Sequence, residues 1–254
     1  MAEKYPGSSP YNYVDNNPIL RIDPDGRDWI VSTSKDKDGK TQINLTYYTA
    51  VMNSSGKDID MKAFMAEQKK TFESVFGQGN VNAQLLIREV GSADQLNDFE
   101  SLIDIQAGSN FEKTADGRVG GDAAIGGKFL RLNADGIGKD GMLSDRKTAV
   151  HEIGHTGGLL HTFDASAKRS FPNGKPVPTG LQQFYNSSNS MEYEANFMNY
   201  TGEAVKSFGI VPGATNYFQN TVGKATRGQI QTIINNLYNG NLNYINIPKN
   251  KRRR

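Results

Sequence analysis

Alternating polar and apolar positions near the start of the chain predict β-strands. Two such stretches, DWIVSTS at 28–34 and TQINLTYYTAVM at 41–52, flank the turn sequence DKDGK at 36–40. Their β-branched and aromatic residues, separated by a turn that contains glycine, predict a hairpin. Further strands are predicted at 81–90, where the pattern is strongest, and at 101–107 and 127–134.

A helical period appears in three other places. The stretch at 61–76 repeats Phe64, Met65, Phe72 and Phe76 at a spacing near 3.6, which predicts an amphipathic helix. A second helix is predicted from an N-cap at Ser144 to the glycine pair at 157–158, and a last one at 226–240. This order of elements predicts an α+β fold, in which a twisted sheet is backed by two helices and followed by an irregular C-terminal part.

The composition restricts the class of protein without naming one. The chain has 254 residues, 36% hydrophobic and 22% charged, which suits a folded globular protein with an ample core. Its net charge is only +2, and its basic cluster is confined to 249–254, so we expect a basic tail and no nucleic-acid partner. It contains no cysteine, which excludes disulfides and thiolate zinc sites. We find neither a signal peptide nor an apolar run long enough to cross a membrane, and expect no membrane partner.

All three histidines of the chain lie within HEIGHTGGLLH, at His151, His155 and His161. Residues four apart share a helix face, so His151 and His155 can point two imidazoles at one ion, with Glu152 beside them as a general base. Gly158 stands where the helix must end, and its freedom to adopt a positive φ lets the chain turn and bring in His161. Three histidines and an open fourth position predict a catalytic Zn²⁺ site.

The same stretch meets every fixed position of HExxHxxGxxH and so resembles the metzincin zinc peptidases. The sequences HTF at 161–163 and NFMNY at 196–200 resemble those of the pappalysin and cytophagalysin family. The resemblance implies a metzincin-like mixed sheet, a Met-turn with Met198 beneath the metal and a catalytic role for Tyr200, which would donate a hydrogen bond to the oxyanion. It also implies that an extended substrate pairs with an edge strand, for which we expect 127–134.

The first part of the chain is rich in Pro, Gly, Asn, Asp and Tyr and shows no helical period. Within it, SPYNYVDNNPILRIDPDGR at 9–27 resembles the end of an RHS repeat-associated core. That resemblance implies a core remnant at 1–27 and a tip domain that starts near Asp28. Together with the zinc motif and the basic run, it predicts a metallopeptidase domain at 28–248 and a basic tail at 249–254. It further implies a toxic effector tip of a larger bacterial polypeptide, secreted or delivered into a target cell. Its partners would be a protein or peptide substrate, the RHS carrier shell and a cognate immunity protein.

Other functions remain open at this point. The chain could be a secreted nutritional metalloprotease, a zinc-containing binding module without catalysis, or an interaction protein in which zinc is structural. An intact Glu152 favours catalysis. The Asp- and Gly-rich stretches at 36–40 and 133–141 resemble calcium loops, but neither has the spacing or closing glutamate of an EF-hand, so we expect turns. A serine triad would need a histidine that is not already committed to metal.

Overall fold

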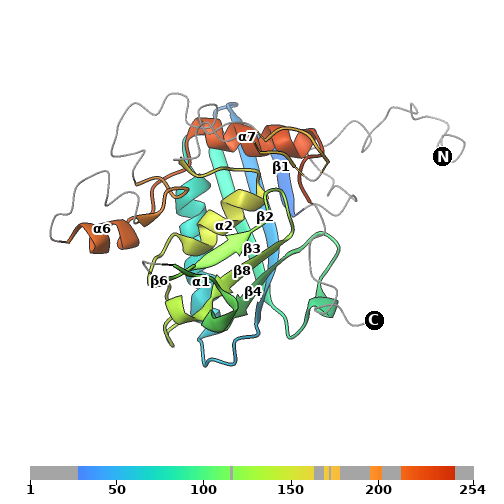
Figure 1. Cartoon of the computed structure of the whole chain (residues 1–254). Helices are drawn as coiled ribbons and strands as arrows, with labels where there is room; N and C mark the ends of the chain where they lie inside the picture. The colour runs from blue at the N-terminus through green and yellow to red at the C-terminus, as the bar shows by residue number, and fades with distance from the viewer. Residues whose placement is uncertain are drawn as a thin grey trace, which may run out of the picture.

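The computed structural model describes residues 28–114, 117–162, 169–171, 173–177, 195–201 and 213–243. These residues form a six-stranded mixed sheet with helices packed against it (Figure 1), and a separate two-stranded antiparallel sheet. The elements along the chain are β1 (Trp29–Lys35), β2 (Thr41–Asn53), α1 (Met61–Phe76), β3 (Val81–Glu89), β4 (Ser101–Gln106), β5 (Lys113–Thr114), β6 (Gly117–Arg118), β7 (Gly121–Ala123), β8 (Phe129–Asn133), α2 (Thr148–Thr156), α6 (Ala214–Asn220) and α7 (Arg227–Tyr238). Short 3-10 turns lie at Ala93–Gln95, Gly108–Asn110 and Ala134–Gly136.

The long strand β2 organises the sheet. On one side it pairs in parallel with β3, and on the other it pairs first with antiparallel β1 and then with parallel β4. The sheet continues from β4 to parallel β8 and ends at β7, which runs antiparallel to β8. A parallel pair needs a crossover connection, and α1 supplies it between β2 and β3. Strand β7, at the end of this path, is joined to β8 by the short segment 124–128, which suits their antiparallel pairing.

The helices cover the sheet at two places and meet each other. Helix α1 packs on β3, whereas α2 packs on β7 and β8, and the two helices are in contact. Asp60 caps α1 by accepting a hydrogen bond from the Ala63 N–H at 2.9 Å. An aromatic cluster fills the core here, with Phe72 and Phe76 of α1 against Trp29, and Phe76 5.2 Å from the ring of Phe197. This cluster ties the start of the described chain to a turn beside α2.

The α+β fold with a mixed sheet is confirmed, and the helix at 61–76 has the predicted bounds. The predicted N-cap at Ser144 is wrong. The backbone N–H of Ser144 donates to Gly136 O at 2.8 Å within a loop, and α2 begins only at Thr148. The sequence pattern also missed β7 and α6. The three residues of β7, GDA, are too few to show a period. The proposed parts 1–27 and 249–254 lie outside the described residues, so the domain limits stay predictions.

Candidate metal centre

Helix α2 carries the first two histidines and ends in a way that brings in the third. Gly158 has φ +82, and its N–H donates to His155 O at 2.9 Å, while the Leu159 N–H donates to Gly154 O at 3.1 Å. These two bonds are those of a Schellman motif, which reverses the chain after a helix. A Cβ at Gly158 would lie 2.3 Å from Asn236 Nδ2 of α7. The positive φ and the close approach of α7 both require glycine at 158. The sequence predicted the positive φ but not the contact with α7.

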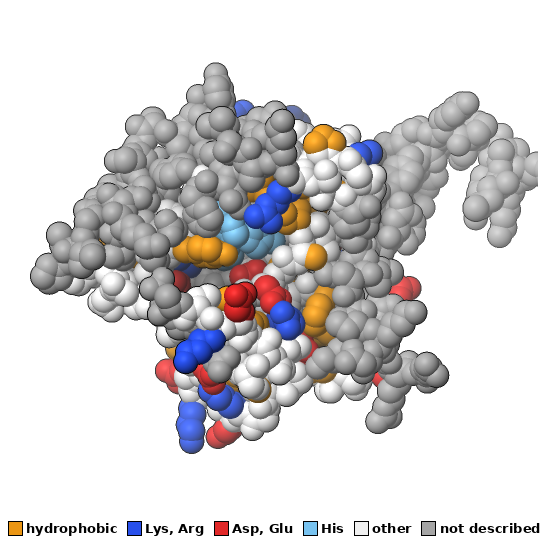
Figure 2. All heavy atoms as spheres, viewed as in Figure 1, with side chains coloured by type: hydrophobic (Ala, Val, Ile, Leu, Met, Phe, Trp, Pro, Cys, Tyr) orange, Lys and Arg blue, Asp and Glu red, His pale blue; other side chains and the backbone are white. Residues whose placement is uncertain are grey.

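The three histidines converge as the spacing predicted. One ring nitrogen from each of His151, His155 and His161 lies within 4.8 Å of the other two, and the Nε2 atoms of His155 and His161 are 3.1 Å apart. Two nitrogens on a tetrahedral zinc ion would be roughly 3.4 Å apart. The histidine side chains are visible on the face shown in Figure 2, with acidic side chains beside them. This cluster can hold a metal ion.

Backbone carbonyls orient two of the imidazoles. His151 Nδ1 lies 2.9 Å from Phe197 O and His155 Nδ1 lies 2.8 Å from Leu159 O. A carbonyl can only accept, so each Nδ1 carries the proton and each Nε2 is left with a lone pair. The Nε2 of His151 is buried and has no hydrogen-bond partner among the described residues. Burial lowers the pKa of His151 well below its usual value, and His155 and His161 lower it further, which favours the neutral ligand form.

Glu152 follows His151 in α2 and packs against β7, the strand at the end of the sheet. Its side chain is buried, and a Cβ at Gly121 of β7 would lie 3.0 Å from Glu152 Cγ. Burial raises the pKa of the Glu152 carboxyl well above its usual value, and the neighbouring Asp122 raises it further. Asp122 is itself paired with Arg131 of β8. A glycine at 121 is what allows β7 to pass so close to this carboxyl group.

A turn at 195–201 lies beneath α2. Met198 is fully buried, and a Cβ at Gly154 would lie 2.5 Å from Met198 Sδ and 2.9 Å from Phe197 Cε2. Gly154, the glycine of HEIGH, is therefore a point of close approach between the helix and this turn. The Thr162 N–H also donates to Met198 O at 3.4 Å, which links the turn to the residue after His161.

Two buried amides, which the sequence reasoning missed, hold this turn. Asn196 Oδ1 accepts from the Met198 N–H at 2.9 Å and from Gln229 Nε2 at 3.1 Å, while Asn196 Nδ2 donates to Gln229 Oε1 at 3.0 Å. Gln229 also completes a capping box with Thr226 at the start of α7. The T-x-x-Q pattern was readable as a helix start, but its pairing with Asn196 required the fold.

Tyr200 leaves the turn on the side of the histidines. Its ring centroid lies 5.2 Å from that of His151 and 4.6 Å from that of His161, and the residue is 47% exposed. The hydroxyl of Thr201 donates to Asp145 Oδ2 at 2.6 Å, just before α2 begins. The structure thus brings Tyr200 to the three histidines, whereas Met198 packs against α2 and Gly158 ends it.

The strand expected to receive a substrate does not fit that role. Strand β8, within 127–134, is paired with β4 on one side and with β7 on the other. A strand with both edges occupied cannot accept another, so this prediction is wrong. Strand β7 ends the sheet path beside Glu152 and has no second strand partner among the described residues. The sequence hid it because only three residues of GDA pair.

Comparison with known proteins adds little to this picture. No family model and no curated protein matches the chain. Among solved structures the chain is similar to archaemetzincin from Archaeoglobus fulgidus, crystallised with malonate. The two share 14% identity with a TM-score of 0.37, over 73% of this chain and 99% of that one. A TM-score this low does not establish a common fold, so the site stands on its own geometry.

Proposed function

We propose that this chain is a zinc-dependent endopeptidase of the metzincin type. The observation that carries the proposal is the convergence of three imidazole nitrogens, from His151, His155 and His161, next to the buried carboxyl of Glu152. The Nδ1 atoms of His151 and His155 are held by carbonyls, so each ring presents an Nε2 lone pair that can serve as a metal ligand. The orphaned, buried Nε2 of His151 fits a ligand whose ion is needed to satisfy it.

Zinc bound by three neutral nitrogens would supply Lewis acidity, lowering the pKa of a water and polarising a carbonyl. The chain's own groups would handle the proton and the charge. Glu152 would take a proton on its carboxylate and pass it to the leaving amine. Tyr200, whose ring lies against His151 and His161, would donate a hydrogen bond from its hydroxyl to the oxygen of the substrate carbonyl.

The open edge of β7 supports an endopeptidase rather than an enzyme for single amino acids. An extended peptide can add to an exposed sheet edge through main-chain hydrogen bonds. Gly121 places that edge against Glu152, so a peptide on β7 would pass beside the metal position. Met198 and Asn196 would have a positioning role, because they fix the turn whose Phe197 carbonyl orients His151.

The proposal is tested with the zinc-loaded full chain, a Glu152→Gln variant and a Glu73→Gln control on the exposed outer face of α1. Zinc content is measured first, and cleavage of a diverse peptide library is then followed by mass spectrometry. We expect equal zinc in all three, cleavage by the parent and the control, and a loss of at least about a hundredfold in Glu152→Gln. Stoichiometric zinc without cleavage by the parent would favour a non-catalytic binding module.

We further propose that the peptidase acts as the toxic tip of an RHS-type polypeptide. This rests only on the resemblance of 9–27, which lies outside the described residues. The expected partners are the carrier shell, target-cell proteins and an immunity protein that blocks the cleft. In the part of the chain that the structure describes, no helix has the length and apolar character of a membrane span. Expression of the chain inside bacteria should arrest growth, whereas Glu152→Gln should not; equal growth of both would contradict the toxin role.

A further inference from the structure

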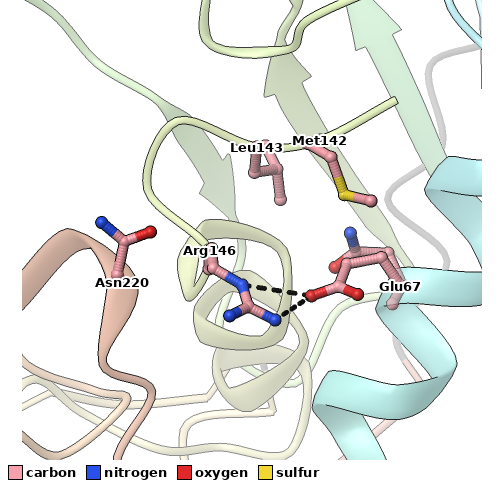
Figure 3. A pocket seen from close by; sticks show the side chains of 6 residues that line it. Glu67, Met142, Leu143, Arg146 and Asn220 are labelled. Carbon is pink, nitrogen blue, oxygen red and sulfur yellow. Dashed lines mark hydrogen bonds and ion pairs between the residues drawn. The ribbon is translucent and has the colours of Figure 1, made fainter. Parts of the chain in front are cut away.

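A pocket of about 250 Å³ lies between α1, the loop before α2 and α6 (Figure 3). None of the residues assigned to the metal centre lines it. Its lining residues are Glu67, Gln68, Met142, Leu143, Arg146 and Asn220. Met142 is 45% exposed and the Arg146 side chain 38% exposed, so the pocket opens to solvent. Methionine is unbranched and flexible, and Met142 can therefore move to admit a ligand with little strain.

Gln68 lines this pocket with a carboxamide that has no partner. The residue is 2% exposed, and neither its Nε2 nor its Oε1 has a hydrogen-bond partner among the described residues. Gln68 lies one turn after Phe64 and one turn before Phe72, on the buried stripe of α1, where the helical period favours an apolar residue. A buried amide without partners destabilises the fold, and buried polar groups are as a rule hydrogen-bonded. Packing of the core therefore does not explain a glutamine here, whereas a ligand that pairs with it would.

The two charges that line the pocket neutralise each other. Arg146 forms an ion pair with Glu67, in which Nε donates to Oε1 at 3.1 Å (Figure 3). The side chains of Met142 and Leu143 add apolar wall beside this pair. A charged ligand would have to break the ion pair or leave its own charge unpaired in the pocket, and both are costly. The lining therefore favours a neutral ligand.

The group that matches Gln68 offers an acceptor and a donor side by side. A glutamine amide has two N–H donors on Nε2 and two lone pairs on Oε1. A carboxylate would satisfy only the donors, and an ammonium only the acceptor. A primary carboxamide satisfies both through two parallel hydrogen bonds and is neutral. A trans peptide group cannot replace it, because its N–H and C=O point in opposite directions.

We propose that this pocket binds the side-chain carboxamide of a glutamine or asparagine within a peptide segment. Gln68 forms the two hydrogen bonds, Met142 contacts the methylene groups, and the pair of Glu67 with Arg146 disfavours charged side chains. The ligand belongs to a peptide because the neutral pocket offers no partner for the ammonium and carboxylate of a free amino acid. The site goes beyond the proposed peptidase activity and does not depend on it.

The test measures binding by ligand-observed NMR, which detects the weak complex expected of one side chain. Zinc-loaded Glu152→Gln protein is titrated with acetylated and amidated Gly-X-Gly tripeptides, in which X is Gln, Asn, Glu or Leu, and with free L-glutamine. We expect the Gln or the Asn peptide to bind about tenfold more tightly than the Glu and Leu peptides. Equal binding of all four peptides overturns the inference. Tighter binding of free glutamine than of the Gln peptide overturns its peptide source.

Variants then assign the preference to the pocket. Gln68→Met keeps the length of the side chain but removes both polar atoms. It should abolish the preference, and in urea denaturation without peptide it should be at least as stable as its parent. The control Gln84→Met makes the same change at an exposed glutamine of β3 and should keep the preference. A preference that survives Gln68→Met overturns the inference.

A third variant tests the role of the ion pair. Glu67→Gln leaves Arg146 without its carboxylate, and so should shift the preference from the Gln peptide towards the Glu peptide. An unchanged preference would refute the exclusion of charged side chains by this pair. If Gln68→Met does not fold, the Glu67→Gln protein and the four parent titrations decide. Gln68-dependent binding in a chain whose Glu152 parent cleaves nothing would refute the peptidase and leave this site standing.

Discussion

Replacing Gly158 by alanine should damage both the fold and the metal site. Gly158 has φ +82, a conformation that costs an L residue about 1 to 2 kcal/mol. The new Cβ would also lie 2.3 Å from Asn236 Nδ2 and 3.1 Å from Phe171 Cζ. Asn236 is buried and donates to Gly157 O at 3.3 Å, so displacing it would cost about 1 to 3 kcal/mol more.

The two costs together predict a loss of about 2 to 5 kcal/mol in the free energy of unfolding. Gly56 provides the matched control, because it has φ +75 but no atom within 4 Å of its added Cβ. Gly56→Ala should therefore lose only the backbone share, about 1 to 2 kcal/mol. Urea denaturation of the metal-free proteins measures both values, and their difference isolates the contact with α7.

Zinc affinity, measured by competition with a chelating dye, should fall for Gly158→Ala and stay the same for Gly56→Ala. The reason is that the turn at Gly158 carries the chain from α2 to His161. Equal destabilisation of the two variants would refute the contact with Asn236. An unchanged zinc affinity in Gly158→Ala would refute the link between this turn and the third ligand.

Three further predictions concern buried groups. Burial raises the pKa of Asp28 to about 7, so the folded protein holds this proton more tightly than the unfolded chain does. The free energy of unfolding should therefore fall as the pH rises from about 4 to 7, and Asp28→Asn should remove up to about 4 kcal/mol of that fall. Denaturation across this pH range measures it, and the same pH dependence in parent and variant would contradict it. Asn196→Ala and Gln229→Ala should each cost about 2 to 4 kcal/mol in urea denaturation, and a double-mutant cycle should show coupling, since simple additivity would mean that the amide pair is not formed. Gly154→Ala should cost about 1 to 3 kcal/mol by overpacking against Met198 and should weaken zinc binding in the dye competition; a neutral effect on both would refute the close contact.

The parts of the fold that follow local rules were predictable. The helix at 61–76 follows from its apolar period, and the turn at Gly158 follows from a glycine that ends a helix. The strands at 81–90 and 101–107 were placed within a residue because their apolar content suits a buried sheet. Ser144 misled because serine is common in loops as well as at caps: it lies four residues before Thr148, the first residue of α2, and its N–H is bonded to Gly136 O within a loop.

The sequence by itself determined the metal cluster, because the spacing of His151 and His155 and the glycine before His161 act through helix and turn geometry that needs no distant partner. Only the tertiary structure decided what surrounds that cluster. Strand β7 became the edge beside Glu152 through its pairing with β8, and the carbonyl of Phe197 reached His151 from far along the chain. Burial, which shifts the pKa values of His151 and Glu152, likewise arises from packing between distant segments. Long-range pairing and desolvation depend on which segments meet in space, and no local pattern encodes that meeting.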